Sequence, residues 1–163
     1  MIELAREAII LRPSVLFGRG DALFRSLAAI TRISPVFPLF GDGSTRLQLV
    51  FVSDVAEAVV NAVGSPSTRG KVYELGGPRV YRYRELVELV LVHLKRRRVF
   101  VSVPFFVWEI QATLLGLLPN APLTRDQVIL MRRDNVVSDT ALTFADLSIT
   151  PRSVEAELPF ILA

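Results

Sequence analysis

Two glycine pairs are the residues of this sequence whose spacing could serve phosphate chemistry. Gly18-Arg19-Gly20 follows an apolar run, and Gly41-Asp42-Gly43 marks a tight turn. A dinucleotide-binding turn needs a third glycine, three residues after the second, so that its helix can pack closely on its strand. Leu23 and Arg46 occupy those positions. Both pairs therefore predict ordinary loops, and neither a P-loop nor a nucleophile-elbow pattern occurs.

Acid–base and metal chemistry also lack a candidate group. Glu85 and Glu88 lie one helical turn apart, but Arg82 and Arg84 beside them indicate a solvated helix face. No tyrosine has a lysine four residues later, and the chain has no cysteine for a disulfide, thiolate ligand or thiol nucleophile. The single histidine, His93, lies on an apolar helix and is interpreted as structural. We predict no catalytic residue, no metal site and no activity for this chain alone.

Alternating strands and helices must position any site that the chain has. Residues 8–16 form an apolar run without alternation, typical of a strand that is covered on both faces. Asp21 can cap the helix that follows, and Asp54 with Glu57 is spaced as a capping box. Pro35 and Pro38 exclude a central strand between them. The other expected elements are strands at 47–52, 71–75 and 98–103, and helices near 54–63, 84–97, 105–118, 124–133 and the C-terminal end.

Composition excludes disorder and gives no support for nucleic-acid binding. The chain is 51% hydrophobic and 21% charged, with a net charge of +3, whereas phosphate tracking needs a stripe of cations. The one cationic run, residues 95–98, either complements a helix C-terminus or contacts an anionic surface.

A segment at residues 99–118 is the most membrane-like part of the chain. Pro104, Glu109 and Gln111 interrupt it, which disfavours a spanning helix, while a helix lying on a bilayer stays open. No N-terminal leader pattern is expected. The predicted location is cytoplasmic, with a location peripheral to the inner membrane as the alternative.

Three motifs, in order, resemble extended or atypical short-chain dehydrogenase/reductases of the NAD-dependent epimerase/dehydratase superfamily. They are ILRPSVLFGRGD, GDGSTRLQLVFVSDVAEAV and VYELGGPRVYRYRELVELV. PLTRDQVILMRRDNVV followed by LPFIL is similar to the branch that includes the NAD(P)-binding accessory subunit of respiratory complex I and its bacterial relatives.

The resemblance implies an α/β fold: the C-terminal part of a Rossmann-like doubly wound parallel sheet, plus a small, mostly helical substrate-side lobe. Residues 1–163 would be a single partial domain without the family's pyrophosphate-binding loop and Tyr-x-x-x-Lys pair. NAD(P) is implied by the resemblance only. The expected partners are the missing N-terminal half or self-association, and a respiratory complex or an anionic membrane surface.

Site roles are likewise implied by the resemblance. Pro13, Ser14 and Val15 would lie beside the nicotinamide, the alternative being a simple strand-to-loop exit. Arg46 would bind a substrate diphosphate, the alternative being a salt bridge to Asp54. Asp54 itself is interpreted as a helix cap. The functions left open are an inactive C-terminal portion of a complex I accessory-type protein, a membrane-peripheral assembly module, and a nucleotide-sugar epimerase/dehydratase fragment.

Overall fold

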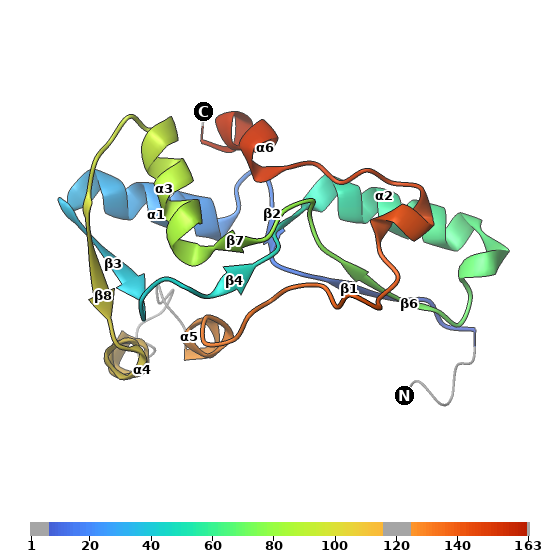
Figure 1. The fold of residues 1–163 in the computed structure, drawn as a ribbon, viewed down its shortest axis with the longest axis horizontal. Coiled ribbons are helices and arrows are strands. Elements are labelled where there is room, and N and C mark those ends of the chain that lie inside the picture. The colour runs from blue at the N-terminus through green and yellow to red at the C-terminus, as the bar shows by residue number, and fades with distance from the viewer. Residues whose placement is uncertain (1–6, 116–124, 163) are drawn as a thin grey trace. The chain divides into compact units, whose positions relative to one another are not determined.

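The computed structural model describes residues 7–115 and 125–162, which form two compact units. The first unit takes the chain up to Phe24, Leu47–Val80 and the segment from Asn135 onward. The second unit takes Arg25–Arg46 and Tyr81–Asp134. Figure 1 shows the elements of both units along the chain.

The first unit contains two parallel strand pairs, β1 with β6 and β2 with β5. Buried side chains of α2, β6 and η3 form its core, among them Ala58, Tyr73 and Phe144. Its elements are β1 (Ile10–Pro13), β2 (Leu16–Phe17), β5 (Val50–Phe51), α2 (Val52–Gly64), the 3-10 turn η2 (Pro66–Thr68), β6 (Val72–Leu75), the 3-10 turn η3 (Phe144–Leu147) and α6 (Val154–Ile161).

The second unit has one parallel strand pair, β3 with β8. Phe37 and Leu39 of β3 are buried, as are Leu86 and Val90 of α3. Its elements are β3 (Val36–Phe40), β7 (Tyr81–Arg82), α3 (Tyr83–His93), β8 (Val99–Val103), α4 (Phe105–Leu115) and α5 (Arg125–Leu130). Two further elements cross the boundary between the units along the chain, α1 (Ala22–Ile33) and β4 (Arg46–Leu47).

The two predicted helix starts have different outcomes. Asp21 caps α1 as expected, because its Oδ1 accepts the Phe24 amide at 2.8 Å. The prediction that Asp54 caps a helix is wrong. α2 begins two residues earlier, its N-cap is Phe51, and Asp54 lies buried in the first turn. The carboxylate is therefore free to bind a distant segment.

The predicted strand at residues 8–16 is two strands with different partners. β1 runs along β6 to Pro13, and the Ser14 amide still donates to the Leu75 carbonyl at 2.9 Å. One residue later, the Val15 carbonyl accepts the Val50 amide at 2.9 Å, which starts the pairing of β2 with β5. The chain thus changes neighbours between Ser14 and Val15.

The predicted α/β class is correct. In the described residues the hydrogen-bonded strands pair two by two, and no continuous ladder joins the pairs. The physical reason lies partly in the change of partner after Pro13. It lies also in β3, a strand that Pro35 and Pro38 hid from the sequence pattern. Of the predicted helices, residues 116–118 and 124 lie outside the described residues.

Candidate functional site

A small cavity lies at the carboxyl ends of β1 and β6 in the first unit. Its volume is about 170 Å³, and its lining is mainly polar. Ligands of parallel α/β folds bind at this end of the strands, where the loops leave the sheet. The lining residues are Arg12, Pro13, Ser14, Glu74, Asn135, Val136 and Val137.

Ser14 joins the two strand ends to the segment that closes the cavity. Its amide binds Leu75, and its hydroxyl donates to Asn135, at 2.9 Å to Oδ1 and at 3.2 Å to the backbone carbonyl. The Asn135 carbonyl also accepts the Gln48 amide at 2.9 Å. These bonds hold the Asn135–Val137 wall in place.

Glu74 supplies the negative charge of the cavity. Its Oε2 accepts the Ser138 amide at 2.9 Å, and its Oε1 lies 3.9 Å from Nη1 of Arg12. The hydrogen bond from the Ser138 backbone, more than the Arg12 charge, lowers the pKa of the Glu74 carboxyl below its ordinary value. One cation and one carboxylate therefore face the cavity together.

Two glycines after β6 allow the cavity wall to approach closely. A Cβ on Gly76 would lie 2.6 Å from side-chain atoms of both Gln48 and Val137, and one on Gly77 would strike the Leu49 carbonyl oxygen. The space is used by Gln48, whose amide nitrogen donates to the Gly77 carbonyl at 2.8 Å and whose Oε1 accepts the Val137 amide at 2.9 Å. The loop thus needs residues without a side chain at this point.

The structure brings two of the three predicted cofactor contacts to the cavity. Pro13 and Ser14 line it, whereas Val15 uses its carbonyl to pair with Val50. Sequence reasoning missed Glu74 and Asn135. Glu74 carried a usable signal, since it is a charged residue in an apolar strand directly before a glycine pair. Asn135 carried none, because the contact that places it spans 121 residues.

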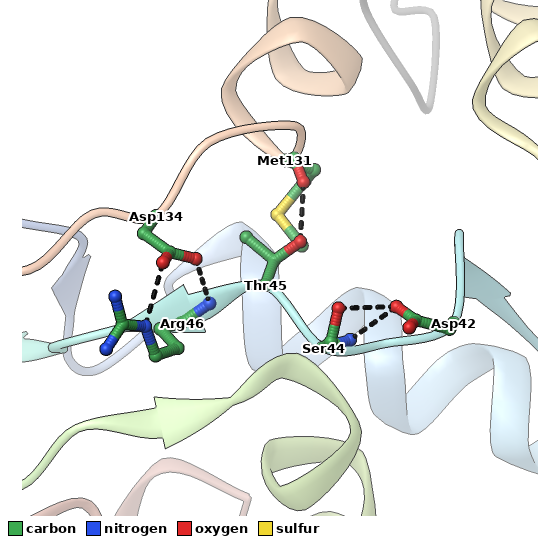
Figure 2. A network of polar contacts seen from close by, with 6 residues as sticks. All are labelled: Asp42, Ser44, Thr45, Arg46, Met131 and Asp134. Carbon is green, nitrogen blue, oxygen red and sulfur yellow. Dashed lines mark hydrogen bonds and ion pairs between the residues drawn. The ribbon is translucent and has the colours of Figure 1, made fainter.

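Arg46, the predicted substrate contact, lies in the second unit and is held by Asp134. Figure 2 shows the Arg46 amide and Nε facing the two carboxylate oxygens, each at 2.8 Å. The bond from the Arg46 amide, more than its guanidinium, lowers the pKa of Asp134. The alternative of a salt bridge is thus confirmed in kind, but its partner is not Asp54. A diphosphate contact by Arg46 stays a prediction.

Two of the cations at residues 95–98 make hydrogen bonds within the second unit. Arg96 and Arg98 donate to the same buried carbonyl, that of Thr31, with distances from 2.6 to 3.0 Å. Lys95 adopts a left-handed φ of 52° directly after the last turn of α3.

Among residues 7–115 and 125–162, no helix is both long and apolar enough to cross a bilayer. The described residues likewise hold no acidic or histidine cluster that could bind a metal ion.

The cavity is too small for a whole dinucleotide. Its volume is below the range of about 300–1,000 Å³ that whole-ligand pockets occupy. Its paired charges suit uncharged amide and ribose groups better than a phosphate. The N-terminus of α1 is already occupied, since Asp21 accepts the Phe24 amide and lies 3.4 Å from the Gly18 amide. A pyrophosphate there would face a carboxylate, so these residues do not fit that part of the cofactor.

Comparison with solved structures shows which known fold this chain shares. A nucleoside-diphosphate-sugar epimerase from Staphylococcus aureus matches with a TM-score of 0.68 and 18% identity, over 91% of this chain and 50% of that one. A dTDP-glucose 4,6-dehydratase from Bacillus anthracis, solved in complex with NAD, matches with a TM-score of 0.63 and 17% identity, over 93% and 42%. These matches show that the chain has a Rossmann-like α/β fold.

The sequence comparisons show which family model and which proteins this chain is similar to. Residues 3–76 match the model of the NAD dependent epimerase/dehydratase family. Over 159 residues the chain is 33% identical to NADH dehydrogenase [ubiquinone] 1 alpha subcomplex subunit 9, mitochondrial, of Arabidopsis thaliana, and over 151 residues it is 33% identical to that of Mus musculus. Each alignment covers 91% of this chain and 40% of the relative, so the chain spans about two fifths of the length of these curated relatives.

These findings correct the placement that the motifs had indicated. The resemblance to the epimerase/dehydratase superfamily and to the complex I accessory subunit is confirmed. The prediction of a C-terminal half that supplies only a nicotinamide-side loop and a substrate lobe is wrong. The family match falls on residues 3–76, at the N-terminal side of this chain, and so assigns that region to the nucleotide-binding part of the family.

Proposed function

We propose that this chain is an NAD-binding component of the complex I accessory-subunit type, with the cavity at the ends of β1 and β6 as its contact with the nicotinamide end of the cofactor. One observation carries the proposal. The cavity combines the expected position for a dinucleotide with polar groups that suit an amide and a ribose.

Each residue of the cavity has a defined part in this proposal. Glu74, whose lowered pKa keeps it ionised, accepts a hydrogen bond from a ribose hydroxyl, as carboxylates do in dinucleotide sites. Pro13 and Ser14 form the wall beside the nicotinamide ring, Val15 follows them without lining the cavity, and Asn135 fixes the Ser14 hydroxyl. When bound, NAD supplies hydride chemistry. These residues bind and orient one end of it.

Ligand fragments test this assignment in solution. In amide NMR spectra of the whole chain, nicotinamide mononucleotide and NADH are expected to shift the resonances of Ser14, Asn135 and Val137, while AMP leaves them unchanged. The two mononucleotides each carry one ribose and one phosphate, so the separation rests on the nicotinamide amide, which can hydrogen-bond with the polar lining of the cavity. Equal shifts with AMP, or no shifts with a folded protein, would contradict the proposal.

A pair of matched variants separates a local role from a general one. Glu74→Gln keeps the shape but loses the charge-assisted acceptor, so binding of nicotinamide mononucleotide is expected to weaken about tenfold. The control is Glu155→Gln, which removes a carboxylate that binds Arg79 elsewhere in the same unit. Unchanged affinity in Glu74→Gln, or equal losses in both variants, would refute the role of Glu74.

We further propose that the partner is a respiratory complex, on the strength of the similarity to complex I subunits over 91% of the chain. The test is a native gel of membranes from cells that express the tagged full-length gene product. The tag is expected to comigrate with the band that has NADH dehydrogenase activity. Migration only at its own mass would refute the association and leave the nucleotide-binding test unaffected.

A further inference from the structure

The strand pair of the second unit has two unlike edges. β3 and β8 run parallel, and within the described residues neither pairs with another strand (Figure 1). Exposed strand edges template pairing with other chains, and proteins often protect them with proline. β3 carries such a proline, Pro38, in its interior, whereas β8 has the sequence Val-Phe-Val-Ser-Val without one.

The hydrogen bonds show which groups of β8 point away from β3. The Val99 amide donates to the Pro35 carbonyl at 3.2 Å, and the Val103 carbonyl accepts the Gly41 amide at 2.9 Å. In a parallel pair, alternate residues direct both backbone groups to the same neighbour. Val99, Val101 and Val103 therefore face β3, and both backbone groups of Phe100 and Ser102 point outward.

The same alternation explains the proline. Phe37, Leu39 and Gly41 are the β3 residues in phase with bonding to β8, so the position of Pro38 is on the far side of the strand. The missing N–H of Pro38 thus interrupts the outer edge of β3 and costs nothing toward β8. Within the part of the chain that the structure describes, proline interrupts one edge of the pair and no strand covers the other.

We propose that the open edge of β8 pairs antiparallel with β8 of a second copy of this chain, about a two-fold axis at Val101. The sequence is symmetric for this register, because Val99 lies opposite Val103 of the second copy and Val101 opposite itself. Phe100 and Ser102 of the second copy become directly opposed. They carry the outward backbone groups, so the two symmetry-related pairs exchange four hydrogen bonds.

Side chains and charges favour the same arrangement. Val99 is 67% exposed and Val101 is 44% exposed, on the face that also exposes Val36 of β3. Pairing joins these valines into one apolar face of a four-stranded sheet. The cations at residues 95–98 precede β8, and an antiparallel register places the two runs at opposite ends. Five residues span roughly 17 Å, which exceeds the screening length in physiological salt.

The interface is short, which determines its strength. Two five-residue strands bury less surface than the ~1,200 Å² of a stable, specific interface. The dimer is therefore expected to form reversibly in the micromolar range, with a dissociation that dilution reveals. A parallel pairing of the two edges would be heterologous and could not close on a two-fold axis.

A single introduced cysteine tests the axis, because the natural sequence has none. In the proposed register the two Val101 Cα atoms are about 4.5 Å apart, within the range that a disulfide spans. Val101→Cys is expected to form a covalent dimer under mild oxidation at least tenfold faster than Val36→Cys. The control residue has a similar exposure, 38%, on the same face but on β3.

The unmodified strand supplies a second measurement. Sedimentation velocity of the natural chain is expected to show a monomer–dimer equilibrium, and Ser102→Pro, which removes an outward N–H, is expected to be monomeric with an unchanged circular dichroism spectrum. Equal cross-linking rates of the two cysteine variants, a dimer that survives Ser102→Pro, or a natural chain that is monomeric at all concentrations would each overturn the proposal. If Val101→Cys cross-linked only to another protein of a complex I preparation, the edge of β8 would pair with a strand of that protein. This result would also overturn the proposed dimer.

Discussion

The ion pair between Asp54 and Arg152 offers the sharpest test of how the first unit is held together. The Asp54 side chain is 2% exposed, and its Oδ2 accepts the Arg152 amide at 2.7 Å. Its Oδ1 lies 3.3 Å from Nε of Arg152, whose side chain is 49% exposed and lies over the Phe51 ring. The first turn of α2 is thereby tied to the segment that leads into α6.

The expected loss of unfolding free energy depends on which polar group remains after each substitution of Asp54. Asp54→Ala removes a charge-assisted bond to a backbone amide, while the half-exposed guanidinium returns to water. The expected loss is about 2–3 kcal/mol of unfolding free energy. Asp54→Asn keeps an acceptor but loses the charge, for a loss of about 1 kcal/mol. A helix cap would behave differently, since Asn and Asp cap equally well.

Urea unfolding followed by far-ultraviolet circular dichroism measures these differences. A double-mutant cycle of Asp54→Ala with Arg152→Ala is expected to give a coupling of about 1 kcal/mol. The matched control is Arg84 with Glu88, an exposed pair on α3 at 3.0 Å, expected to give about 0.3–0.5 kcal/mol. The reasoning is refuted if Asp54→Asn unfolds like the natural chain and both couplings are equal, because Asp54 would then act as a cap.

Three further predictions concern packing and pH. Gly77→Ala is expected to cost about 1–3 kcal/mol in urea unfolding because its Cβ strikes the Leu49 carbonyl, whereas Gly64→Ala, at an open position in α2, is expected to gain about 0.5–1 kcal/mol. Burial raises the pKa of Tyr83 above its ordinary 10.0, so the unfolded state loses the phenolic proton first and the free energy of unfolding falls as pH rises above 10. Tyr83→Phe is expected to reduce the fall of the thermal midpoint with pH in this range. An unchanged slope in the variant would contradict this prediction. The pKa of Glu74 lies below its ordinary 4.5, so its contribution to the free energy of unfolding is present above pH 4.5 and is lost as pH falls further. Glu74→Gln is expected to reduce the loss of stability at acid pH. The same loss of stability in the variant and the natural chain would contradict this prediction.

Local signals in the sequence predicted local structure well. The turn at Gly41-Asp42-Gly43 forms as expected, with φ values of 56° and 78° at its two glycines, and Asp42 binds the Ser44 amide (Figure 2). The cap at Asp21 needs only residues three positions apart. In both cases the side chain and the backbone that it binds are neighbours, so the residue types alone determine the interaction.

Only one wall of the candidate site, the one formed by Pro13 and Ser14, could be predicted from the sequence. Pro13 and Ser14 were indicated by the family resemblance, and the end of a parallel strand is a position where ligands bind. The opposite wall, residues 135–137, comes from a distant part of the chain and is joined to Ser14 and to Gln48 by two hydrogen bonds each. A pattern of period two or 3.6 contains no information about such a contact. For the same reason Arg46 was assigned a salt bridge but the wrong carboxylate.

β3, the strand that the sequence pattern did not predict, contains Pro38. The proposed role of β8 as the pairing edge depends on this proline. Pro38 argues against a central strand, and β3 is indeed paired only through β8 within the described residues. A proline is tolerated there because its position in the ladder faces outward. The same residue that hides β3 from periodicity therefore blocks pairing on that side, and β8 alone keeps an edge whose backbone groups are available. If Pro38 serves this purpose, Pro38→Val should add a second open edge and convert the reversible dimer into larger assemblies, which sedimentation velocity would resolve. A variant that remains no larger than a dimer would show that the proline is incidental to the choice of edge.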